Sequence, residues 1–169
     1  MQSSLTARRG RLPVAPPVRH DRAVSGRIYS VGYEGLAAAA LVDRLAGAAV
    51  TKLFDVRLNA SSRKPGFSGK SLSAALRSAG IEYVHEPDLG NPRENREVFR
   101  QGDIDLGRRR MRARLGHSGS EALGRLVDAA HGSRVAVLCV ERDQLRCHRH
   151  VITDMAVERS QSLEVLQVL

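Results

Sequence analysis

Short apolar runs alternate with helical patterns from residue 27 onward, and this alternation limits the fold more than any other feature. The apolar runs are RIYSVG at 27–32, TKLFDVRL at 51–58, IEYVH at 81–85, VAVLCV at 135–140 and SLEVLQVL at 162–169. Segments that are expected to be helical fill the intervals at 36–49, 70–79, 93–100, 106–115, 120–131 and 144–159. Strands separated by helices pair in parallel through right-handed crossovers. The sequence therefore predicts a three-layer α/β fold with a mostly parallel central sheet of about 4–5 strands flanked by helices.

The chain divides into a tail and one domain. Residues 1–26 are rich in Arg, Pro, Ser and Ala, which predicts a flexible basic N-terminal tail. Residues 27–169 are expected to form a single α/β domain, because a chain with 42% hydrophobic residues can fill one core. Residues 86–119 are polar, basic and interrupted by Gly and Pro, which predicts a basic helical insertion that lies over the edge of the sheet.

The net charge of +9 is concentrated in two segments. Residues 1–26 hold five arginines and one aspartate, and residues 92–114 hold eight arginines and four acidic residues. Segments of this kind either face phosphate or nucleic acid or form an ordinary solvated surface. The charge alone does not choose between these readings.

The cysteine content and the hydropathy bear on the compartment. The two cysteines lie eight positions apart and nothing resembles a secretory signal, so we expect a reducing, cytoplasmic location. No run approaches the roughly 18 apolar residues that a membrane helix needs, so no membrane partner is expected.

The stretch VAVLCVERDQLRCHR at 135–149 is typical of a strand, a tight loop and a helix. Asp143 suits the N-cap position, because its carboxylate can accept from the free N–H groups of the first helical turn. Parallel strands send their βα loops to one edge of the sheet, where open α/β sheets bind ligands. We therefore expect a crevice lined by five reactive or charged side chains: Cys139, Glu141, Cys147, His148 and Arg149.

Residues of this junction are candidates for catalysis. His148, in the first turns of the predicted helix, should resist protonation there and act as a base beside Glu141, as a ligand or as a structural hydrogen-bond partner. Cys147 lies near the same helix terminus, a condition for a lowered thiol pKa and nucleophilic attack. Arg149 would orient an anionic group, while Cys139 is expected to be a small core residue.

Charged residues also follow the second strand. Asp55 and Arg57 are two apart and point the same way, so they either pair as a strand-end ion pair or meet a ligand together, with Asp55 as a further acid or base. Arg63 and Lys64 lie in a Gly/Pro loop before a helix N-terminus, where they form either an anion cradle or a solvated loop.

Aromatic and polar residues complete the predicted rim. Phe67 either plugs its loop onto the core, which is the favoured reading, or stacks on a base. Glu34 follows the first strand and is placed to act as an acid or base or to hold a ribose hydroxyl. Tyr33 and His85 are further candidate ligand-binding residues.

Three known site patterns fit poorly. GYEG lacks the G-x-G-x-x-G spacing of dinucleotide binders. A cysteine phosphate loop needs arginine six positions after the cysteine, where Leu145 follows Cys139. Zinc on Cys139, Cys147, His148 and His150 is disfavoured, because there is no C-x-x-C pair and the two histidines point to different helix faces; no metal is expected.

Four motifs carry a resemblance to a known family. SVGYEG, LFDVRLNASSRKPGFS, IEYVHEPDLGNP and VLCVERD…CHR resemble, in order and spacing, the motifs of the bacterial and archaeal domain-of-unknown-function family numbered 488. The resemblance runs from about Tyr29 to Met155, most of the chain. It implies an α/β sandwich domain of a cytosolic protein and no established activity.

These features favour an enzyme, a hydrolase or transferase, that acts on a phosphate-bearing substrate, either a nucleotide or nucleic acid. Arg57, Arg63, Lys64 and Arg149 would bind the anion in a crevice at the carboxyl ends of the strands. The alternative is a non-catalytic nucleic-acid-binding or regulatory module that uses the same basic rim. A scaffold whose polar motifs only brace loops is a third reading. The sequence indicates no particular cofactor or oligomeric state.

Overall fold

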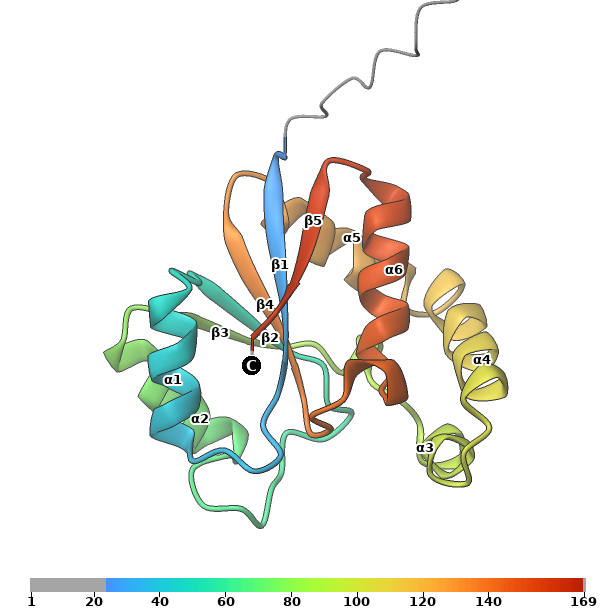
Figure 1. Ribbon diagram of the computed structural model, residues 1–169, viewed down its shortest axis with the longest axis horizontal. Coiled ribbons are helices and arrows are strands. Elements are labelled where there is room, and N and C mark those ends of the chain that lie inside the picture. Colours follow the sequence, from blue (N-terminus) through green and yellow to red (C-terminus); the bar gives the residue numbers. More distant parts are fainter. Residues whose placement is uncertain (1–23, 169) are drawn as a thin grey trace, which may run out of the picture.

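The computed structural model describes residues 24–168 and shows a central sheet between two layers of helices (Figure 1). Within those residues there are five strands: β1 (Gly26–Gly32), β2 (Lys52–Asp55), β3 (Glu82–His85), β4 (Arg134–Cys139) and β5 (Leu163–Gln167). The α-helices are α1 (Ala38–Gly47), α2 (Gly69–Ser78), α3 (Arg93–Arg100), α4 (Ile104–Gly116), α5 (Ser120–Ala130) and α6 (Arg149–Arg159). Two 3-10 turns are η1 (Pro87–Leu89) and η2 (Gln144–Arg146).

All strand pairs of the sheet are parallel, in the order β3-β2-β4-β1-β5. The predicted fold class is therefore confirmed, with five parallel strands at the upper end of the expected number. The register pairs Gly32 with Cys139 and Asp55 with Leu138, so β1, β2 and β4 end close to one another at one edge. This edge receives the βα loops.

The two faces of the sheet carry separate hydrophobic cores. One core packs residues of α1 and α2, among them Leu41 and Leu72, against Leu53 and Leu138 of the sheet. The other packs α4, α5 and α6 against the opposite face, with Ile152 of α6 fully buried. Figure 1 shows the two helical layers on either side of the strands. Burial on both faces explains why the central strands are apolar runs without alternation.

Local signals set several element ends where the sequence predicts them. Ser68 caps α2, because its Oγ accepts from the backbone N–H of Ser71 at 3.2 Å. Gly80 follows α2 with a φ of 73°, a left-handed conformation that favours glycine. The predicted last strand is present as β5, although Leu169 lies outside the described residues.

The predicted helix from 144 to 159 is interrupted. Asp143 caps only the short turn η2, where its Oδ1 accepts from Leu145 N at 2.8 Å. Cys147 then adopts an extended conformation, with φ −125° and ψ 150°, and His148 is the N-cap of α6. The expectation that Cys147, His148 and Arg149 share the first turns of one helix is therefore wrong for Cys147 and His148, and only Arg149 begins a helix.

The predicted basic insertion contains η1, α3 and α4, which pack together on the side of α5 and α6 rather than over an edge strand (Figure 1). Met111 and Leu115 of α4 are fully buried in the core beneath α5 and α6. Of the predicted N-terminal tail, residues 1–23 lie outside the described residues. Among residues 24–168, no helix has the length and hydrophobicity that a membrane crossing requires.

Candidate functional site

A crevice forms where β1 and β4 end, because the helices that follow these neighbouring strands cover opposite faces of the sheet. Helix α1 follows β1 on one face and α6 follows β4 on the other. The loop after β4 crosses the end of β1 closely. A Cβ added to Gly32 would lie 1.9 Å from the backbone oxygen of Glu141, so only glycine permits this approach. Open parallel sheets bind ligands at such switch points.

Four reactive side chains gather at the end of β4, and we name them the Cys–His cluster: Cys139, Glu141, Cys147 and His148. Their ligand atoms all lie within 4.8 Å of one another. Both thiols approach the same carboxylate oxygen, Oε2 of Glu141, at 3.0 Å from Cys139 Sγ and 3.1 Å from Cys147 Sγ. The imidazole Nδ1 of His148 lies 3.6 Å from Cys147 Sγ and 3.9 Å from Cys139 Sγ. The cluster confirms that these predicted residues come together.

The orientation of His148 follows from a contact distant in sequence. Its Nε2 lies 3.1 Å from the backbone oxygen of Val56, at the end of β2. A carbonyl oxygen only accepts hydrogen bonds, so Nε2 carries a proton and Nδ1 faces the two sulfurs. Burial alone would lower the pKa of His148, but the negative charge of Cys147 and Glu141 raises it overall. The expectation that His148 resists protonation is therefore wrong, because anionic neighbours outweigh the helix terminus.

The two thiols have opposite pKa directions. Burial favours the neutral thiol of Cys147, but hydrogen bonding with Cys139 and the nearby His148 hold the Cys147 pKa well below its usual value. The hydrogen bond with Cys147, together with burial, raises the pKa of Cys139. Burial and the negative charge of Cys147 also raise the pKa of Glu141. Cys147 is thus the more acidic thiol, through Cys139 and His148 rather than through the helix terminus that the sequence suggested.

Arg149 is an anchor of the cluster rather than a free anion-binding group. Its side chain is 1% exposed. Its guanidinium donates to Ser30 Oγ at 3.1 Å, to Cys147 Sγ at 3.4 Å and to the backbone oxygen of Glu141. These bonds tie α6 to β1 and to the loop after β4, and they direct positive charge at one of the sulfurs.

A cavity of about 330 Å³ opens over the Cys–His cluster, and we name it the cluster crevice. Glu141, Cys147 and His148 line its floor. Its lining also includes three arginines from two elements: Arg96 and Arg100 of α3, and Arg146 of η2. A smaller cavity of about 170 Å³ adjoins it, shares Arg96, Glu141 and His148, and reaches Tyr33 and Arg57.

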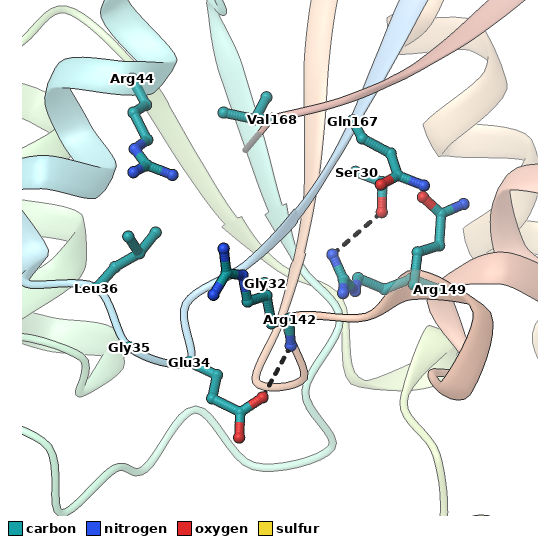
Figure 2. A pocket seen from close by; sticks show the side chains of 11 residues that line it. Ser30, Gly32, Glu34, Gly35, Leu36, Arg44, Arg142, Arg149, Gln167 and Val168 are labelled. Carbon is teal, nitrogen blue, oxygen red and sulfur yellow. Dashed lines mark hydrogen bonds between the residues drawn. The ribbon is translucent and has the colours of Figure 1, made fainter.

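A third cavity, of about 210 Å³, lies on the β5 side of β1, and Figure 2 shows the side chains that line it. Glu34 lies at its rim, where Oε2 accepts from the backbone N–H of Arg142 at 3.1 Å. Arg149 forms part of its wall beside Ser30. Glu34 also lines the cluster crevice, so the first βα loop borders both cavities.

Asp55 and Arg57 form a buried ion pair. Arg57 Nε donates to Asp55 Oδ1 at 2.8 Å, and Tyr83 OH donates to Asp55 Oδ2 at 2.7 Å. Asp55 is 0% exposed and Arg57 is 5% exposed. Burial would lower the pKa of Arg57, but the hydrogen bonds to Asp55 more than offset it and raise that pKa. Of the two alternatives that the sequence offered, the structure therefore matches the strand-end ion pair. The ion pair holds Arg57 at the border of the smaller cavity.

The loop after β2 packs as a plug. Phe67 is fully buried and stacks on Tyr33, with ring centroids 4.2 Å apart. Lys64 Nζ donates to the backbone oxygen of Tyr33 at 3.1 Å and lies over both rings. His85 Nε2 is 2.9 Å from the backbone oxygen of Arg57. Phe67, Lys64 and His85 are therefore engaged in holding loops, and the favoured plug reading of Phe67 fits this packing.

Two further comparisons with the sequence predictions concern residues outside the cluster. Arg63 is exposed and lines none of the three cavities described above. His150, considered as a fourth zinc ligand, instead faces Asp154 at 3.5 Å, and Glu141 occupies the fourth place in the cluster. The sequence reading also missed Arg96, Arg100 and Arg146 as crevice residues. The i, i+4 spacing of Arg96 and Arg100 places them on one helix face, which is the signal that was available.

The range matched in comparisons with known proteins contains three of the four sequence motifs, and SVGYEG at 30–35 lies outside it. A family model described as Domain of unknown function DUF488 matches residues 37–156. A search of curated proteins and a search of solved structures returned no match. The matched range contains the whole Cys–His cluster and all three crevice arginines.

Proposed function

Because this chain belongs to the family described as domain of unknown function DUF488, whose description assigns no activity, we propose its function from the site itself. The protein is an enzyme, a hydrolase or transferase, that acts on a phosphate-bearing substrate in the cluster crevice. One observation carries this proposal: exposed arginines and three residues of the reactive Cys–His cluster, Glu141, Cys147 and His148, line the same cavity.

The crevice arginines are available to bind an anion. Within residues 24–168, the side chains of Arg96 and Arg146 make no hydrogen bond or ion pair with another residue, and Arg100 has only a 3.4 Å contact to exposed Glu97. Guanidinium groups bind phosphate through paired, charge-assisted hydrogen bonds. We place the phosphate of the substrate between Arg96 and Arg146.

The size of the cavity favours a small reacting unit. A volume of about 330 Å³ is near the lower end of ligand cavities, which suits a mononucleotide or a single nucleotide of a longer strand. The reacting group of that unit then lies against the Cys–His cluster, which carries the chemistry. Both cysteines are free thiols, so a reducing, cytoplasmic compartment suits this enzyme.

The arginines of the basic insertion favour a local phosphate site over a broad surface that binds a polyanion. Several of its arginines are engaged within the fold, since Arg108 donates to the backbone oxygen of Leu145, Arg112 pairs with Glu158 at 2.7 Å, and Arg114 donates to Gly90. Of the arginines in the insertion that are not engaged in this way, Arg96 and Arg100 line the crevice, whereas Arg93, Arg109 and Arg110 do not. A nucleic-acid-binding or regulatory module is the alternative, and it predicts binding without turnover.

The test measures binding and turnover with a panel of nucleotides and of single- and double-stranded oligonucleotides, across a range of salt concentrations. Arg96→Ala/Arg146→Ala should weaken binding of phosphate-bearing probes about tenfold or more, equal to about 1.4 kcal/mol. The control Arg77→Ala/Arg110→Ala removes the same charge from exposed positions outside the crevice and should leave affinity within twofold.

Turnover of a member of the panel, followed by mass spectrometry of the products, should be lost in Glu141→Ala while binding survives. Binding of the panel without turnover would favour the alternative module. Equal effects of the two arginine pairs would remove the crevice as the binding site.

A further inference from the structure

The Cys–His cluster has the composition and shape of a metal centre. It presents two sulfurs, one imidazole nitrogen and one carboxylate oxygen from positions 139, 141, 147 and 148, all within 4.8 Å of one another. Zinc in proteins takes these three kinds of donor and is usually four-coordinate. We propose that Cys139, Glu141, Cys147 and His148 bind a tetrahedral divalent transition-metal ion, zinc in the first place.

The distances between donors agree with this coordination. Zinc lies about 2.3 Å from sulfur and about 2.0–2.2 Å from nitrogen or oxygen, so sulfur and a lighter donor on adjacent corners of a tetrahedron are roughly 3.6 Å apart. The corresponding distances are 3.6 and 3.9 Å from the two sulfurs to His148 Nδ1, and 3.0 and 3.1 Å to Glu141 Oε2. A shift of about half an ångström in the half-buried Glu141 side chain brings its two oxygen–sulfur distances to this value.

The groups around the donors prepare them for a cation. The bond from His148 Nε2 to the backbone oxygen of Val56 fixes the ring and turns the Nδ1 lone pair toward the sulfurs. Arg149 donates to Cys147 Sγ, a contact that stabilises a thiolate. Two thiolates and a carboxylate around a divalent cation leave one negative charge, which the buried guanidinium of Arg149 balances.

A disulfide between the two cysteines is the competing use of these thiols. It would leave Glu141 and His148 without a role, although both are directed at the sulfurs from different elements. Both sulfurs also converge on one carboxylate oxygen, Oε2 of Glu141. Convergence of four donor atoms on one centre is what metal coordination requires and what a disulfide does not.

The metal centre borders the cluster crevice and so extends the proposed function. The proposal of a metal rests on the geometry of the cluster and not on the identity of the substrate. Cys139, Cys147 and His148 are at most 5% exposed, whereas Glu141 is half-buried and borders the crevice. Glu141 is therefore the ligand that a water or substrate oxygen can displace. A three-ligand centre with an exchangeable fourth position is the arrangement of catalytic zinc sites.

The test is a cobalt titration of the full-length protein, stripped of metal by a chelator and kept reduced, with no substrate present. We expect about one equivalent of Co²⁺ per chain, with thiolate-to-cobalt charge-transfer absorption and tetrahedral d–d bands, and displacement by Zn²⁺. His148→Ala and Cys147→Ser should each weaken cobalt affinity by more than about 100-fold, beyond what changes in outer-shell groups produce.

His150→Ala is the matched control, because His150 lies two positions after His148 and faces Asp154 instead of the cluster. It should retain the cobalt spectrum unchanged. Where a cysteine variant does not fold, the wild-type protein supplies the second measurement: Zn²⁺ should protect both thiols from alkylation.

Absence of the charge-transfer band in the folded wild-type protein, or alkylation of both thiols at the same rate with and without Zn²⁺, would overturn the metal site. That result would leave the crevice arginines and their phosphate binding untouched. Conversely, a bound metal in a protein that binds no phosphate probe would remove the proposed substrate and keep the centre.

Discussion

Replacing Asp55 with Asn tests the buried ion pair that braces the smaller cavity. The change keeps the shape of the side chain but removes the charge that faces Arg57, whose side chain is 5% exposed. The guanidinium then remains buried without its counter-ion. Breaking a buried ion pair from one side costs about 3–5 kcal/mol. We expect Asp55→Asn to lower the free energy of unfolding by about 3 kcal/mol, because Arg57 keeps its bonds to Tyr33 OH and to the backbone oxygen of Phe67.

Urea unfolding followed by circular dichroism measures this loss. With a slope of roughly 2 kcal/mol per molar urea, a loss of about 3 kcal/mol moves the midpoint down by about 1.5 M. Glu164→Gln is the matched control, because it breaks the Arg27–Glu164 pair, which has both side chains 40% exposed. Exposed pairs contribute about 0–1 kcal/mol, so the control midpoint should move by less than about 0.5 M.

The double variant Asp55→Leu/Arg57→Met tests whether the unpaired buried charge of Arg57 causes the loss of stability. If the unpaired buried charge is responsible, removal of both charged groups should recover part of the stability lost in Asp55→Asn. Equal midpoints for Asp55→Asn and Glu164→Gln would refute the reasoning, because they would mean that Arg57 reaches solvent when its partner is neutral.

Three further perturbations have defined outcomes. Gly32→Ala should cost about 2–3 kcal/mol in urea unfolding, because its Cβ would meet the backbone of Glu141 at 1.9 Å, whereas Gly47→Ala, with open space around it, should be neutral or stabilising. Phe67→Leu should lower stability by about 1 kcal/mol or more and leave nucleotide affinity unchanged; a base-stacking role would instead lose about 1–3 kcal/mol of binding. Burial and the hydrogen bond to Asp55 raise the pKa of Tyr83 above its ordinary 10.0. The protonated Tyr83 hydroxyl therefore contributes its full stabilisation of the fold below pH 10.0 and loses it as pH rises through the raised pKa. Tyr83→Phe should flatten the alkaline decline when the free energy of unfolding is measured against pH.

Local patterns in the sequence were sufficient to predict the α/β architecture. Apolar runs and helical spacing depend on neighbouring residues alone, and their alternation permits few topologies other than a parallel sheet with crossovers. The same holds for the cap at Ser68 and the stop at Gly80, which act within one turn of their own helix. The gathering of loops at one edge then follows from parallel pairing, so the sequence alone predicts that the residues at 139–149 lie at this edge.

The tertiary structure decided how those residues are used. The extended conformation of Cys147 interrupts a stretch with helical spacing, and its sulfur is held by Glu141 and Arg149. His148 is oriented by Val56, which is 92 positions away. The pKa of His148 is raised by Cys147 and Glu141, which an expectation based on the helix terminus alone does not include.

The residue sequence by itself therefore determined the layers, the parallel sheet and the edge at which reactive groups collect, because short-range periodicity and chain connectivity control these features. Only the folded chain decided that Glu141 rather than His150 completes the cluster, that Asp55 and Arg57 are buried together, and that Arg96 and Arg146 face the same cavity. The physical reason is that side-chain directions at the rim are set by contacts between segments far apart in the sequence, such as the bond from Arg149 to Ser30 across 119 positions.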